Sequence, residues 1–203
     1  MANATGAFGL KPVRMAGGGS YSAAVESCYI ASGYATALFI GDPVILSDES
    51  DDKDTTGYMY SVEKAGVADG SVIFGVIVGF EPLVTDLTKP YNPASTARVA
   101  KVCRAAGVIF EIRGDGGGTP TKEFPGLNAI MIQTAAGSTA TGLSGIHLDE
   151  GTGTAPSANQ SNPLYILRVK NKPDNVLGDN AIYEVEINTP YNATGRTLGV
   201  AGS

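Results

Sequence analysis

The chain has 203 residues, of which 20 are Asp or Glu and 14 are Lys or Arg, giving a formal net charge of −6. An acidic surface repels phosphate backbones, which argues against general nucleic-acid binding. Only 17% of the residues are charged, whereas 27 are Gly and 11 are Pro. This composition is typical of a β-sandwich or barrel and fits a helical bundle badly. No apolar run approaches the roughly 20 residues that a membrane helix needs, so we expect no membrane partner.

Residues 1–20 are predicted to form an extended N-terminal arm. Apolar and polar residues alternate weakly in this segment, and a glycine-rich stretch then breaks the pattern. Such a segment is either mobile alone or ordered against a partner as an extended strand. The candidate partner-binding residues of the arm are Phe8, Leu10, Lys11 and Arg14.

Short runs rich in Val and Ile, separated by Gly, Pro, Asn and Asp, predict about ten β-strands in the rest of the chain. Three of these runs fall within residues 71–113, which we expect to form the core. The fold class is therefore all-β, either an antiparallel β-barrel or a jelly-roll-like sandwich, with one domain over residues 21–190 and a tail over 191–203. Strands are predicted at residues 35–40, 43–46, 58–63, 72–80, 97–102, 108–112, 129–133, 143–148, 164–170 and 181–188, and the candidate protruding loops are 114–125 and 152–163.

The only cysteines are Cys28 and Cys103, and the N-terminus has no apolar h-region of the kind that marks a secreted chain. A disulfide is therefore disfavoured, and two small buried thiols in a reducing cytoplasm are the expected state.

No constellation of residues predicts catalysis or a cofactor. His147 is the only histidine, and its neighbours Ser144 and Asp149 lie too close along one strand to form a triad with it. One histidine also excludes a multi-histidine zinc site built by this chain alone. The glycines at 114–118 lack the Lys-Ser/Thr and the helix that a phosphate cradle needs.

One acidic loop matches a calcium site in part. Asp52, Asp54, Thr56, Gly57 and Glu63 fall at positions 1, 3, 5, 6 and 12 of an EF-hand-like loop. Thr stands where Asp or Asn is usual, the flanking segments predict strands rather than helices, and a run of acids matches easily by chance. The prediction is therefore no metal, with this loop as the calcium alternative.

Five blocks of the chain resemble, in their order and spacing, the capsid decoration or cement proteins of tailed bacteriophages. The blocks are MANATGAFGLKPVR, ATALFIGDPVIL, GVIVGFEP, YNPASTARVAKV and PDNVLGDNAIYEVEIN. The resemblance implies a β-barrel or jelly-roll-like virion protein, made in the host cytoplasm, without a catalytic site. It would bind the capsid exterior and stabilise contacts between major capsid subunits. Its implied partners are the major capsid protein and itself, as a homodimer or homotrimer at a capsid symmetry axis.

A second reading stays open, in which the chain is a β-rich carbohydrate- or receptor-binding virion module. Tyr58, Tyr60 and Tyr91 would then have to line a groove, although their scatter on alternating strands favours packing. A hydrolase is the least favoured alternative, because no spacing pairs a nucleophile with a base.

Overall fold

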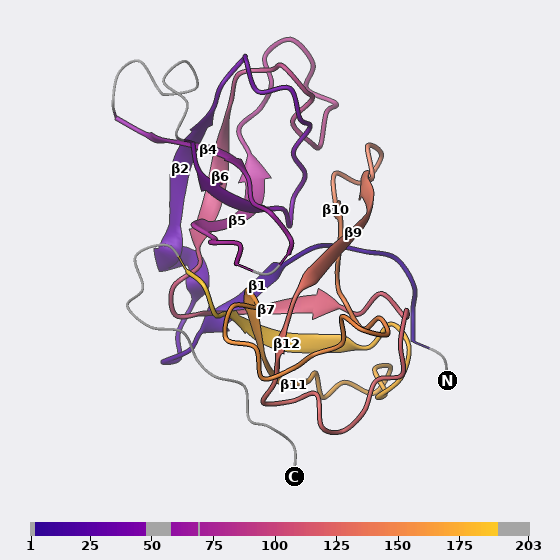
Figure 1. Ribbon diagram of the computed structural model, residues 1–203. Coiled ribbons are helices and arrows are strands. Elements are labelled where there is room, and N and C mark those ends of the chain that lie inside the picture. The colour runs from indigo at the N-terminus through magenta and orange to yellow at the C-terminus, as the bar shows by residue number, and fades with distance from the viewer. Residues whose placement is uncertain (1–2, 48–57, 69, 191–203) are drawn as a thin grey trace.

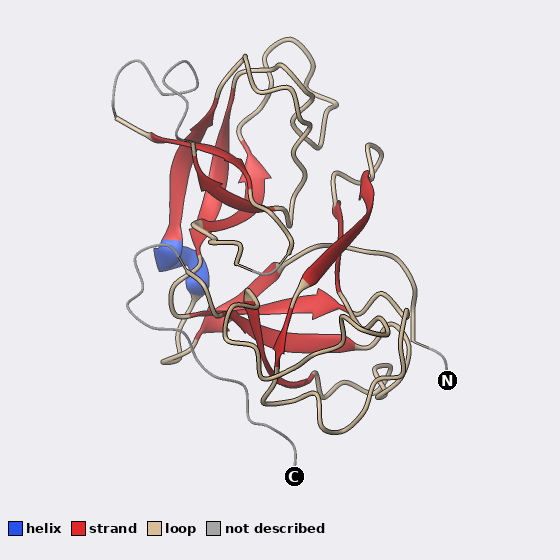
Figure 2. Cartoon of the chain, in the orientation of Figure 1, coloured by secondary structure: helices blue, strands red, loops and turns tan. Residues whose placement is uncertain are grey.

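The computed structural model describes residues 3–47, 58–68 and 70–190, which form an almost entirely β structure (Figures 1 and 2). The predicted all-β class is confirmed. No helix among these residues is long and apolar enough to cross a membrane. The elements are β1 (Lys11–Met15), the 3-10 turn η1 (Tyr21–Ala24), β2 (Val25–Ile30), β3 (Pro43–Leu46), β4 (Tyr60–Lys64), β5 (Gly75–Phe80), β6 (Arg98–Arg104), β7 (Val108–Arg113), β8 (Asn128–Ala129), β9 (Met131–Gly137), β10 (Ser144–Leu148), β11 (Leu164–Val169) and β12 (Ile182–Ile187).

A closed five-stranded barrel, in the order β2-β4-β3-β5-β6, occupies the upper part of Figure 1. Its pairings are antiparallel except for the parallel pair β2–β4. β6 shows how the barrel strands divide their side chains between two faces, because alternate side chains of a strand face opposite sides. Ala100 and Val102 lie in the buried cluster of the barrel with Phe74. Lys101, between them, instead bonds Ser27 Oγ and Glu81 Oε1.

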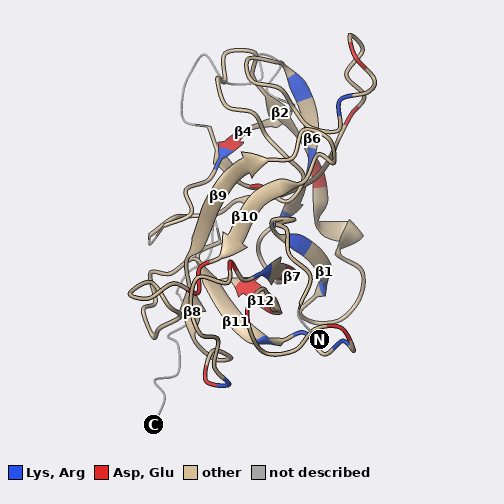
Figure 3. Cartoon of the chain, turned by 90° about the vertical axis from the view of Figure 1, so that its right-hand side faces the viewer, with Lys and Arg blue, Asp and Glu red and all other residues tan. Residues whose placement is uncertain are grey.

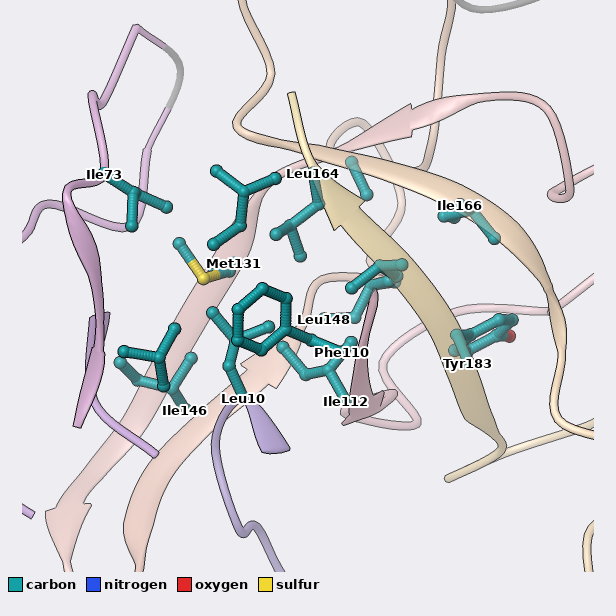
Figure 4. Close-up of a cluster of buried hydrophobic side chains, with 14 of the residues drawn as sticks. Leu10, Ile73, Phe110, Ile112, Met131, Ile146, Leu148, Leu164, Ile166 and Tyr183 are labelled. Carbon is teal, nitrogen blue, oxygen red and sulfur yellow. The ribbon is translucent and has the colours of Figure 1, made fainter. Parts of the chain in front are cut away.

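The second layer is a five-stranded antiparallel sheet in the order β1-β7-β12-β11-β8, accompanied by the β9–β10 hairpin. Alternate residues of β7 and β12 face a shared core, and each large apolar side chain buried there stabilises the fold by about 1.5–3 kcal/mol. Figure 4 shows this cluster, whose labelled members are Leu10, Ile73, Phe110, Ile112, Met131, Ile146, Leu148, Leu164, Ile166 and Tyr183.

The barrel and the sheet share this core. Val76 of β5 and Cys103 of β6 belong to the same buried cluster as the sheet residues, so the two layers are packed together rather than merely linked. Both cysteines are free and buried, as the sequence predicts. They lie in different clusters, Cys28 with the barrel residues and Cys103 with the sheet residues.

The expected N-terminal arm is not confirmed. Residues Lys11–Met15 form β1 and pair with β7, with Lys11 opposite Glu111. Leu10 is only 1% exposed, and its N–H donates to Gly41 O at 2.9 Å. Burial of this apolar side chain favours ordering the segment against its own sheet, which offsets the entropy that a mobile arm would keep.

The strand predicted at 35–40 is also absent. This segment makes only isolated bridges, Leu38 to Asn92 and Ile40 to Leu143. Its turn is fixed by the Asp42 carboxylate, which accepts a hydrogen bond from Phe39 N at 2.9 Å. An apolar run alone could not reveal that a side chain competes for the backbone donors.

The two candidate protruding loops are tied to the sheet. In the first, Gly114 N donates to Ala181 O at 2.9 Å, and Phe124 is buried in the sheet core. In the second, Asn162 is 5% exposed and its amide donates to Asn128 O at 3.4 Å.

Candidate partner-binding site

A cavity of about 590 Å³ lies beside the N-terminal segment, a volume within the usual range of about 300–1,000 Å³ for ligand sites. Side chains from the N-terminal segment, the barrel, the loop before β10 and the sheet contribute to its walls. We call it the N-terminal cavity, and its main apolar lining residues are Phe8, Leu10, Ile40, Ile77, Leu143 and Ile182.

The polar part of this lining is mostly basic. Lys11, Lys170 and Lys172 line the cavity together with Glu111, the one acid of the lining. Lys170 is ion-paired with Glu111, and Lys172 Nζ lies 2.9 Å from Asp174 Oδ2. Lys11 makes no ion pair with any residue that the structure describes.

The structure therefore brings together three of the four residues predicted to contact a partner. Phe8, Leu10 and Lys11 line one cavity, although as fixed parts of its wall rather than as a free arm. The fourth, Arg14, binds elsewhere: its Nη2 lies 3.7 Å from Glu184 Oε2, which also accepts from Arg168 at 2.6 and 3.0 Å. In Figure 3 acidic and basic segments intermix over the sheet, whereas the β9–β10 hairpin carries neither.

The loop over residues 81–97, between β5 and β6, presents apolar side chains to solvent. Val84 is 94% exposed and Leu87 is 77% exposed. Between them, Asp86 Oδ1 accepts hydrogen bonds from Thr88 N at 3.0 Å and Thr88 Oγ1 at 2.6 Å, which fixes the turn. We refer to this segment as the β5–β6 loop.

Arg98 holds the base of the β5–β6 loop. Its guanidinium donates to Glu81 O at 2.6 Å and to Tyr91 O at 2.7 Å, and it lies 5.0 Å from the centre of the Phe80 ring. Its relative exposure is 9%, and burial lowers the pKa of the group. Because a guanidinium has several donors in a fixed plane, one side chain can bind both Glu81, at the start of the loop, and Tyr91, within it.

Two of the three tyrosines of the carbohydrate-binding reading pack on another aromatic ring. The ring of Tyr91 is stacked on Phe39 with 5.1 Å between centroids, so one of its faces is covered. Tyr58 is 91% exposed and Tyr60 is 51% exposed. The ring of Tyr60 packs edge-on against Phe74 with centroids 5.4 Å apart.

Most of the candidate calcium loop lies outside the described residues. Asp52, Asp54 and Thr56 fall in this part of the chain, whereas Glu63 lies on β4 opposite Ile45. Within residues 3–47, 58–68 and 70–190, no group of three His, Cys, Asp or Glu side chains could hold a metal ion.

The residues around the single histidine have separate partners. Ser144 Oγ donates to Asp42 Oδ1 at 2.6 Å, and Asp149 Oδ1 accepts from Gly151 N and Thr154 Oγ1, both at 2.8 Å. His147 Nδ1 lies 3.4 Å from Thr134 Oγ1. Burial lowers the pKa of His147.

The burial of two carboxylates could not be predicted from the sequence, because the side chains that bind them are distant along the chain. Asp42 is fully buried, with Lys64 Nζ 3.2 Å from its Oδ1 in addition to the bond from Ser144. Glu150 is 1% exposed and accepts hydrogen bonds from Tyr183 Oη at 2.6 Å and Gly116 N at 3.0 Å. Burial raises the pKa of both carboxyl groups.

The glycines at 114–118 have a packing role in this arrangement. A Cβ on Gly114 would overlap the Glu150 carboxylate, and a Cβ on Gly118 would overlap the Glu150 carbonyl oxygen. At Gly118 the backbone of the loop thus approaches the backbone of Glu150 so closely that only glycine fits, whereas at Gly114 the Glu150 side chain would have to move.

Comparison with known proteins gives no relative: no protein-family model, curated protein or solved structure matches the chain.

Proposed function

We propose that the chain is a structural virion protein that binds the outer surface of a bacteriophage capsid and stabilises contacts between major capsid subunits. Its partners would be the major capsid protein and further copies of itself, as a homodimer or homotrimer at a symmetry axis. The five sequence blocks that resemble decoration proteins support this proposal. The structural observation that supports it most directly is the β5–β6 loop, which leaves the apolar side chains of Val84 and Leu87 exposed to solvent.

An apolar side chain that is exposed in the free protein gains about 1.5–3 kcal/mol when a partner buries it. A loop already fixed by Arg98 loses little further conformational entropy on contact, so more of this gain becomes affinity. Repetition of the contact by symmetry-related copies would add avidity without any stronger single contact.

The test is co-sedimentation of the purified protein with capsids of the parent particle that lack it. The double variant Val84→Ser, Leu87→Ser removes the exposed apolar surface. We expect its affinity to fall by at least about tenfold, since the loss of roughly 1.4 kcal/mol suffices for that change. The matched control is Val176→Ser, Leu177→Ser, which alters an exposed Val–Leu pair elsewhere, 48% and 43% exposed.

Two results would contradict the proposal. If the wild-type protein does not bind such capsids, the assignment to the capsid is wrong. If both double variants bind as tightly as wild type, the β5–β6 loop is not the contact surface.

The exposed tyrosines support the second candidate, a carbohydrate- or receptor-binding virion module. Tyr58 and Tyr60 present aromatic surface at the start of β4, and aromatic faces are common in sugar sites. Binding of the isolated protein on a glycan array, lost in Tyr58→Ala, would favour this candidate. Absence of glycan binding together with capsid binding would reject it.

A further inference from the structure

We propose that the N-terminal cavity receives an apolar side chain from an acidic segment of the partner protein. This inference rests on the proposed function, in that the partner would be a protein of the capsid. It names the chemistry that the partner must present: one large apolar side chain flanked by carboxylates. The inference concerns a surface separate from the β5–β6 loop, because no residue of that loop lines the cavity.

The apolar part of the ligand follows from the lining. Phe8, Ile40, Leu143 and Ile182 are each only partly buried, so the cavity retains apolar surface that a partner could cover. Transfer of a Leu or Phe side chain from water to such a surface is favourable by about 1.5–3 kcal/mol. The volume of about 590 Å³ accommodates one such side chain together with part of its backbone.

The acidic part of the ligand follows from the charges beside the cavity. The chain as a whole has a net charge of −6, yet three of the four charged residues that line this cavity are lysines. Glu111 compensates Lys170, and Asp174 compensates Lys172. Lys11 remains as a cation without an ion pair among the described residues, so a carboxylate is the complementary group.

The neighbouring sheet edge argues for insertion of a side chain rather than addition of a strand. β1 is an edge strand of its sheet, and its residues Lys11 and Pro12 line the cavity. Pro12 has no N–H to donate, and the β1–β7 register shifts between Pro12 and Arg14. Proline and bulges are features that keep an edge strand from pairing with another chain.

The experiment measures binding of short peptides to the full chain by NMR titration. The probe is the peptide Gly-Glu-Phe-Glu-Gly, with Gly-Lys-Phe-Lys-Gly and Gly-Glu-Ser-Glu-Gly as controls for charge and for the apolar side chain. We expect saturable shifts confined to cavity residues with the first peptide only. The variant Lys11→Glu should weaken binding by roughly fivefold or more, the scale of losing an exposed ion pair and gaining a repulsion.

A second variant and a matched control keep the test independent of any effect on folding. Leu143→Trp would fill the cavity and should abolish binding, whereas Lys122→Glu reverses an exposed charge outside the cavity and should leave binding unchanged. Equal binding of the acidic and basic peptides, or binding unaffected by Lys11→Glu and Leu143→Trp, would overturn the proposal. So would absence of peptide binding, or binding of decanoate alone, which would assign the cavity to small amphipathic anions.

These outcomes are separable from the proposed function. Capsid co-sedimentation that persists in Leu143→Trp would reject the cavity as the contact and leave the capsid assignment standing. Absence of wild-type binding to capsids, with the acidic peptide still bound, would reject the capsid assignment and leave the chemistry of the cavity standing.

Discussion

Glu150 shows how a single residue organises its surroundings. Its carboxylate accepts hydrogen bonds from the buried Tyr183 hydroxyl and from Gly116 N. A Cβ at Gly114 would overlap this carboxylate, and a Cβ at Gly118 would overlap the Glu150 backbone carbonyl. The sequence displays the glycines but not their reason, because the glycine run and Glu150 are more than thirty positions apart. Residue types are visible in a sequence, whereas the contacts that require them depend on the fold.

Glu150 also makes a prediction about pH. Burial raises its pKa above the ordinary value of 4.5, so the folded state holds this proton more tightly than the unfolded state does. Its contribution to the free energy of unfolding therefore falls as pH rises from 4.5 through the raised pKa. In Glu150→Gln this contribution is gone, and urea unfolding between pH 4.5 and 7 should show a smaller loss of stability than in wild type.

The control for this prediction is Glu186→Gln, on the strand β12 that also carries Tyr183. This variant should keep the wild-type dependence of stability on pH. The comparison uses the slope with pH rather than the absolute stability, since the Gln amide also replaces one of the two hydrogen-bond acceptors. Parallel pH profiles for wild type and Glu150→Gln would contradict the assigned burial effect.

At the scale of elements, β1 is the main difference from the sequence-based prediction, which expects an extended arm where the structure has a paired strand. The sequence suggests an arm because the segment is short, weakly patterned and followed by glycines. Leu10, directly before the strand, enters the sheet core, and Gly9 passes so close to Gly41 that a Cβ would overlap the Gly41 carbonyl. Such long-range packing cannot be inferred from the local sequence. Apolar and polar residues alternate in the same way whether or not a segment pairs with another strand of its own sheet.

Because β1 is part of the sheet, a truncation of the N-terminal segment would test stability as well as partner binding. Removal of residues 1–20 would remove β1 and Leu10, so we expect it to destabilise the protein rather than simply delete a binding arm. Leu10→Ala should lower the free energy of unfolding by about 2–5 kcal/mol, as for other large-to-small substitutions in a core. Val13→Ala, at a partly exposed position in β1, should cost clearly less in the same denaturant experiment. Equal stability of Leu10→Ala and wild type would show that the segment is not part of the core.

The β5–β6 loop gives a second prediction at this scale. Arg98→Lys keeps the charge but removes the planar set of donors that binds Glu81 O and Tyr91 O. The expected result is a loss of roughly 1–3 kcal/mol of stability, with faster proteolysis within residues 81–97. The matched change Arg168→Lys affects an exposed arginine on β11 and should leave proteolysis of the loop unaltered. Unchanged cleavage in Arg98→Lys would show that Arg98 does not fix the loop.

At the scale of the whole molecule, the sequence predicts the class and most strands but not their assembly. Runs such as Pro43–Leu46 and Leu164–Val169 are strands because Val, Ile and Leu suit a pleated, buried surface and turn residues bound them. The pairing of β1 with β7, and of β2 with both β4 and β6, joins residues far apart in the chain. Local periodicity carries no information about such partners. For the same reason the sequence predicts three residues that line the N-terminal cavity, Phe8, Leu10 and Lys11, but not the cavity itself.

The arrangement of the molecule also separates two surfaces with different chemistry. The β5–β6 loop offers exposed aliphatic side chains on a fixed turn, and the N-terminal cavity offers an apolar hollow beside lysines. A protein that joins neighbouring subunits needs more than one contact surface, and this arrangement is consistent with the proposed function on physical grounds alone.

The most direct test of that function is cryo-electron microscopy of the parent bacteriophage particle. We expect density that fits the barrel and sheet on the capsid exterior, at a symmetry axis, with Val84 and Leu87 within contact distance of a major capsid subunit. Capsids that lack the chain should show no density at these positions. Density for the chain in the tail or inside the shell, or its absence from the particle, would contradict the account.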